Sequence, residues 1–85
     1  MSVRRLQRDE IGQRGSSIYE SKLRDRLESN YHGQFVAIDV ESDEYEIDKD
    51  SASAANRLWT RLPDAQVFIE RIGYPAAFHA YVAKT

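Results

Sequence analysis

The stretch of sequence that decides the fold is Gln34-Phe35-Val36-Ala37-Ile38-Asp39-Val40-Glu41. β-Branched and aromatic residues dominate it, which is typical of a β-strand. Val36, Ile38 and Val40 would line one face of that strand. Phe35 and Ala37 would give the other face an apolar half. Because a strand that is apolar on both sides is usually central, we expect the sheet to be built around this segment.

Three further segments predict strands. Residues 45–48 alternate between apolar and polar side chains and follow an acidic turn at 42–44, so they complete a β-hairpin with the first strand. Residues 66–72 and 77–82 predict a second hairpin, with the turn at 73–75.

Two amphipathic segments predict helices. The first covers residues 17–31, begins with a capping box at 17–20 and carries apolar side chains at helical spacing. The second covers residues 51–62 and is capped by Asp50 or Ser51. The element order is therefore helix, β-hairpin, helix, β-hairpin.

This order predicts the α+β fold class with a four-stranded, mainly antiparallel sheet. A right-handed crossover through the second helix makes the third strand parallel to the second, which gives the strand order 2-1-3-4. We expect both helices to cover one face of this sheet. Apolar side chains in the opposite strand phase would then be left on an open face: Phe35, Ala37, Phe68 and Ile72.

Length and composition predict one small domain. A chain of 85 residues has room for a single core, which we place at residues 16–85. Residues 1–15 predict a basic flexible arm, because Gly12 and Gly15 interrupt any helix there. The chain has no cysteine, no secretory signal and no apolar run of the roughly 20 residues that span a bilayer. We therefore expect a cytoplasmic protein without a membrane association.

Charge is strongly segregated along the chain. Residues 1–26 carry a net charge of +3, residues 27–50 carry −7, and residues 51–85 carry +2. Such an asymmetry concerns what the surface attracts rather than the fold. It predicts an acidic hairpin that would steer the protein toward a basic surface.

Five short pieces of the sequence form a distinctive pattern in aggregate. They are Gly33-Gln34-Phe35-Val36-Ala37-Ile38-Asp39, Tyr45-Glu46-Ile47, Arg57-Leu58, Pro63-Asp64-Ala65-Gln66 and Arg71-Ile72-Gly73-Tyr74. The pattern resembles that of a group of small bacterial proteins of unknown function, often cyanobacterial, over about residues 17–81. This chain lacks the glycine that often follows their last strand. The resemblance implies the same fold and no activity, and it favours a partner-binding role in a two-gene, antitoxin-like unit.

The sequence does not assemble a catalytic or metal site. Asp39 and Glu41 are spaced like the first motif of metal-dependent exonucleases, but two-metal hydrolysis needs further converging carboxylates that this chain does not supply. His32 and His79 lie on separate elements without matched ligand spacing. We expect no cofactor, no metal and no small-molecule substrate. A divalent-metal enzyme that uses Asp39 and Glu41 remains a disfavoured alternative.

The function we predict is that of a non-catalytic interaction module. It would form a homodimer or bind a protein partner through the open sheet face or an edge strand. The residues expected at that contact are Phe35, Ala37, Phe68, Ile72, Asp39, Glu41, Asp43 and Glu44. The alternative is a nucleic-acid-associated regulator that uses the arginines of the arm, although residues 27–85 would repel a polyanion. Those arginines are Arg4, Arg5, Arg8 and Arg14.

Overall fold

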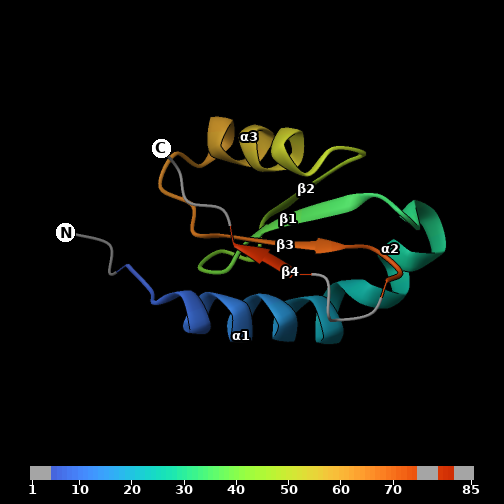
Figure 1. Cartoon of the computed structure of the whole chain (residues 1–85), viewed down its shortest axis with the longest axis horizontal. Helices are drawn as coiled ribbons and strands as arrows, with labels where there is room; N and C mark the ends of the chain where they lie inside the picture. Colours follow the sequence, from blue (N-terminus) through green and yellow to red (C-terminus); the bar gives the residue numbers. More distant parts are fainter. Residues whose placement is uncertain (1–4, 75–78, 82–85) are drawn as a thin grey trace.

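The computed structural model, which describes residues 5–74 and 79–81, has helices on both faces of an antiparallel β-sheet (Figure 1). The elements in chain order are α1 (Arg8–Ile18), a π-helical segment η1 (Tyr19–Leu23), α2 (Arg24–Tyr31), β1 (Phe35–Asp39), β2 (Tyr45–Asp48), α3 (Ser51–Arg61), β3 (Val67–Arg71) and β4 (His79–Tyr81). The predicted α+β class with an antiparallel sheet is confirmed.

Strand β1 lies in the middle of the sheet, between β2 and β3, and pairs antiparallel with both. Val36 lies opposite Ile47 on one side and Glu70 on the other. Strand β4 pairs antiparallel with the far side of β3. Residues 75–78 and 82–85, which include the remainder of the predicted 77–82 strand, lie outside the described residues.

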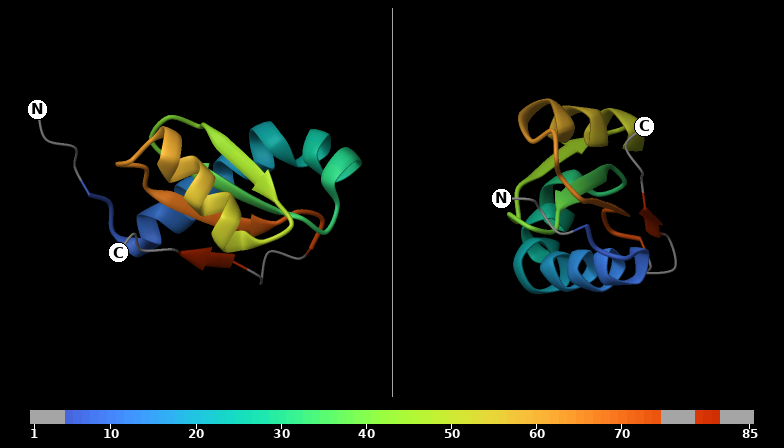
Figure 2. Two further views of the ribbon diagram at one scale, coloured as in Figure 1. Left: turned by 90° about the horizontal axis from the view of Figure 1, so that it is seen from above. Right: turned by 90° about the vertical axis from the view of Figure 1, so that its left-hand side faces the viewer.

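The expectation that both helices cover one face is wrong. Helix α3 packs on one face, against a cluster that includes Ala37 and Ile69, while α1, η1 and α2 pack on the other, against Val36, Ile38 and Phe68. Figure 2 shows α3 and α1 on opposite sides of the strands. Both phases of β1 and β3 are apolar, so each face needs its own cover. No open apolar face is left on these two strands.

The predicted start of the first helix at Ser17 is also wrong, because α1 begins at Arg8. Residues 8–15, assigned from sequence to a flexible arm, form the first turns of this helix. Gly15 is buried within α1, and a Cβ atom there would lie 2.1 Å from Phe68 Cγ. The glycine therefore allows the helix to approach the sheet closely instead of interrupting the helix.

The π-helical segment η1 connects α1 and α2 into a continuous run of helix. Its extra residue per turn brings Ile18, Tyr19 and Leu23 all to the buried face, where Leu27 joins them. The last apolar side chain of the helix predicted at residues 17–31 is not buried, since Tyr31 is 40% exposed. The buried part of the helix therefore ends one turn early and leaves an aromatic ring at the surface.

Candidate interaction site

The β1–β2 turn, where most of the predicted acidic residues lie, is held together by Asp39. Its Oδ1 accepts hydrogen bonds from the N–H of Gln66 at 3.1 Å and of Glu41 at 3.3 Å, and its Oδ2 accepts from the Ser42 hydroxyl at 2.8 Å. Asp39 is 5% exposed. A buried carboxylate that accepts three hydrogen bonds fixes the backbone around it, so its role here is to hold the turn to β3.

The acidic segment is not a free negative surface. Cations from the helices on both faces pair with it, as five contacts show. They are Arg14–Glu41 at 3.5 Å, Lys22–Asp43, Arg61–Glu44 at 3.1 Å, Arg57–Glu46 at 2.9 Å and Arg57–Asp48 at 3.0 Å. Such exposed pairs add little stability, but they cancel much of the local field that was expected to steer a basic partner.

Three of the four apolar residues that were predicted to line an open face are buried. Ala37, Phe68 and Ile72 each have a relative exposure of 0%, and Phe35 is half-buried. Ala37 faces α3, whereas Phe68 and Ile72 belong to the cluster under α1 and α2. A partner cannot contact the three buried side chains in this fold.

Two of the arginines of the nucleic-acid alternative contact other parts of the chain. The Arg5 guanidinium donates to the Asp64 carbonyl at 3.2 Å, and Arg14 pairs with Glu41. Arg8 is exposed in the first turn of α1, and Arg4 lies outside the described residues. Arg5 and Arg14 are thus held by contacts with other parts of the chain rather than on a mobile arm.

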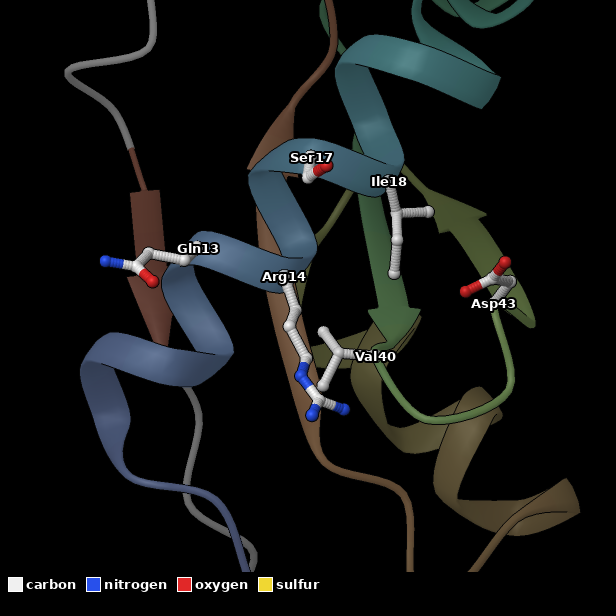
Figure 3. Close-up of a pocket in the computed structure, with 6 residues that line it drawn as sticks. All are labelled: Gln13, Arg14, Ser17, Ile18, Val40 and Asp43. Carbon is white, nitrogen blue, oxygen red and sulfur yellow. The ribbon is translucent and has the colours of Figure 1, made fainter.

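A pocket of about 360 Å³ lies between α1 and the β1–β2 turn (Figure 3). Its wall is formed by Gln13, Arg14, Ser17, Ile18, Val40 and Asp43. Figure 3 shows that Gln13 points away from the other five side chains. Because Arg14 and Asp43 are held in ion pairs with Glu41 and Lys22, the pocket offers a ligand little uncompensated charge.

A second group of ionisable side chains lies where η1 and α2 pack on β3. The Tyr19 hydroxyl donates to Glu28 Oε2 at 3.0 Å and accepts from the Gly73 N–H at 3.4 Å. Burial raises the pKa of Tyr19. Glu70 on β3 is 2% exposed, and burial, together with the nearby charges of Glu20 and Glu28, raises its pKa to about 7. Within the described ranges no group of three or more His, Cys, Asp or Glu side chains could hold a metal ion.

The raised pKa of Glu70 predicts a specific pH dependence of stability. The folded state binds the Glu70 proton more tightly than the unfolded chain does. The resulting contribution to the free energy of unfolding is therefore complete below about pH 4.5 and is lost as the pH rises through about 7. The Glu70→Gln variant stays neutral, so its unfolding free energy relative to wild type should rise by roughly 1–2 kcal/mol from pH 5 to pH 8. Urea unfolding at both pH values measures this. Exposed Asp64→Asn is the control, and a pH-independent difference for Glu70→Gln would refute the prediction.

At the other end of the sheet, aromatic rings surround Arg71. The guanidinium carbon of Arg71 lies 4.0 Å from the centroid of the Tyr74 ring and 5.6 Å from that of Phe35. The His32 ring lies 5.6 Å from the Tyr74 ring, tilted by 32°. Tyr31 precedes His32 at the end of α2. We call Tyr31, His32, Phe35, Arg71 and Tyr74 the aromatic cluster.

Backbone hydrogen bonds hold the two halves of the aromatic cluster together. The N–H of Gly33 donates to the Ile72 carbonyl and the N–H of Ile72 to the Gln34 carbonyl, both at 2.8 Å. Gly73 has a φ of +87°, and a Cβ atom there would lie 2.1 Å from the His32 ring. The turn after β3 therefore requires glycine, both for its conformation and for the room that His32 occupies.

Sequence reasoning missed this site. Tyr31 was assigned to the end of the first helix and Tyr74 to a turn, and His32 was weighed only as a metal ligand. Arg71-Ile72-Gly73-Tyr74 entered only as part of a resemblance. The available signal was the presence of tyrosines beside glycines in two turns, where burial is not expected. The contact between those turns comes from the pairing of β1 with β3 and is not visible locally.

No protein-family model, curated protein or solved structure was found to match the chain. In the part of the chain that the structure describes, no helix is both long enough and apolar enough to cross a membrane.

Proposed function

We propose that this chain is a non-catalytic interaction module that binds a protein partner through the aromatic cluster. The observation that carries the proposal is the exposure of Tyr31 and Tyr74. They are the two large hydrophobic residues that remain exposed in the described part of the chain, at 40% each, and both belong to the cluster. Tyrosine and arginine are enriched among the residues that dominate protein–protein binding energy.

The geometry of the cluster supports this role because its side chains are held in place before a partner arrives. Stacking of Arg71 on Tyr74 and the glycine turn under His32 restrict rotation of these groups. A surface whose side chains are already ordered loses less conformational entropy on binding. The cluster thus combines exposed apolar area with low ordering cost.

The proposal uses the cluster rather than the edge of the sheet. With β4 (His79–Tyr81) as the fourth strand, the sheet has the order 2-1-3-4, as expected from sequence, and β2 lies at one edge. Glu46 and Asp48 of β2 are charged and pair with Arg57. Charged side chains on an edge strand disfavour the addition of another strand.

Selection of random dodecapeptides displayed on phage against the immobilised chain tests the proposal. We expect the selected peptides to lose at least about tenfold in affinity for the Tyr31→Ser/Tyr74→Ser variant, because two exposed anchors are removed. Gln13→Ser, an exposed substitution in α1, serves as the matched control and should bind as wild type does. Peptides that bind the double variant as well as wild type would show that the cluster is not the contact surface.

A further inference from the structure

We infer that Arg71 recognises the carboxylate of an acidic side chain in the partner, while the surrounding rings contact an aromatic residue next to it. The inference rests on the proposed function and names the chemistry of the bound segment. It concerns a protein segment with an internal Asp or Glu, not a free chain terminus.

The environment of the Arg71 guanidinium leaves one edge available. Its central carbon lies over the Tyr74 ring at 4.0 Å and over the Phe35 ring at 5.6 Å from the ring centroids, and its Nε donates to the Gly33 carbonyl at 3.2 Å. Among residues 5–74, the two terminal nitrogens have no hydrogen-bond acceptor and no carboxylate partner. These nitrogens carry the donors that bind a carboxylate in a bidentate manner.

Arg71 differs from the other described cations because it is half-buried without a carboxylate partner. Arg5, Arg8, Arg26 and Lys49 also lack such a partner in the described part of the chain, but they are exposed. Arg14, Lys22 and Arg24 each pair with a carboxylate of this chain, as do Arg57 and Arg61. Arg71 is half-buried, so its charge is partly removed from water without a compensating anion among the described residues. An incoming carboxylate would supply that anion where screening by solvent is reduced.

Charge also decides the kind of partner. A second copy of the chain docked symmetrically through the same cluster would bring two Arg71 guanidinium groups together, and like charges at an interface are costly. A partner segment that carries a carboxylate beside an apolar ring complements both the charge and the aromatic surroundings. We therefore assign the cluster to an acidic, aromatic-containing segment of another protein.

The test uses three short peptides and the ¹⁵N-labelled chain, observed by NMR. The first is acetyl-Gly-Phe-Glu-Phe-Gly-amide, the second replaces its Glu by Gln, and the third is the Gln peptide with a free C-terminal carboxylate. We expect the Glu peptide to shift resonances of residues 31–35 and 71–74 and to bind at least fivefold more tightly than both Gln peptides. Arg71→Gln should remove that preference, and Arg61→Gln, a cation at the opposite end of the sheet, should retain it.

Arg71→Lys separates recognition from folding. Lysine keeps the charge but lacks the planar guanidinium that packs on aromatic rings and binds a carboxylate in a bidentate manner. We therefore expect the Arg71→Lys variant to have a native NMR spectrum and a reduced preference for the Glu peptide. Equal binding of the Glu and blocked Gln peptides at the cluster would overturn carboxylate recognition and leave the proposed function standing. Stronger binding of the free-terminus peptide would overturn the assignment to a side chain. Shifts elsewhere, or none, would overturn the inference, while the phage selection judges the proposed function separately.

Discussion

The Gly15→Ala variant should be less stable than wild type by about 3 kcal/mol, although alanine is the better helix former. The added Cβ atom would lie 2.1 Å from Phe68 Cγ and 2.5 Å from Phe68 Cβ. Phe68 is fully buried in β3, so the part of its side chain next to the backbone cannot move away. Either α1 or β3 must shift, and the packing on this face of the sheet is disturbed.

Urea unfolding followed by circular dichroism measures this loss. Ser16→Ala, a neighbouring substitution in the same helix, controls for the change in helix propensity. In a Phe68→Leu background the additional cost of Gly15→Ala should be smaller, because the clashing ring is gone. An unchanged or increased stability of Gly15→Ala would contradict the close packing of α1 on β3.

The Asp39→Ala variant should also lose about 3 kcal/mol, because it leaves buried donors without an acceptor. The N–H groups of Gln66 and Glu41 and the Ser42 hydroxyl all donate to this carboxylate. The backbone of Gln66 is buried, so water cannot fully replace the lost bond.

Thermal and urea unfolding of Asp39→Ala, Asp39→Asn and Asp64→Ala distinguish this role from a general effect of charge. The Asn variant keeps one acceptor oxygen and should lose less than the Ala variant. Asp64 is exposed, so Asp64→Ala should stay within about 0.5 kcal/mol of wild type. Wild-type stability of Asp39→Ala would mean that the carboxylate is free, as the metal-enzyme alternative requires.

Much of the fold could be predicted because the deciding signals are local. The strand at residues 35–39 is apolar in both phases, and its central place in the sheet follows from that pattern. The start of α3 follows from Asp50, whose Oδ2 accepts a hydrogen bond from the Ser53 N–H at 2.9 Å. Such patterns depend on neighbouring residues alone.

The start of α1 could not be predicted from local rules. A glycine lowers helix propensity wherever it stands, and Gly15 is favourable only because Phe68 needs the space, which is known only in the folded chain. The same limit applies to the two-sided cover of the sheet. Two apolar strand phases predict that something must cover the second face, and the earlier start of α1 provides the helical surface that does so.

The candidate site was beyond local reasoning for a related reason. The acidic residues were visible as a charge run, but their cations come from α1, η1 and α3, far away in sequence. Conversely, nothing in the sequence singled out Arg71, because its contacts with the Phe35 and Tyr74 rings arise only in the folded chain. The charge run in the sequence therefore pointed to the β1–β2 turn, whose acidic side chains are paired with cations of this chain. It did not point to the aromatic cluster.

The central claim is that the aromatic cluster, and not the pocket beside the β1–β2 turn, is the surface that partners contact. Its most direct test is chemical-shift mapping of the tightest phage-selected peptide on the ¹⁵N-labelled wild-type chain. We predict that the largest amide shifts fall within residues 31–35 and 71–74. Largest shifts at Gln13, Arg14, Ser17 and Asp43, which line the pocket, would contradict the claim.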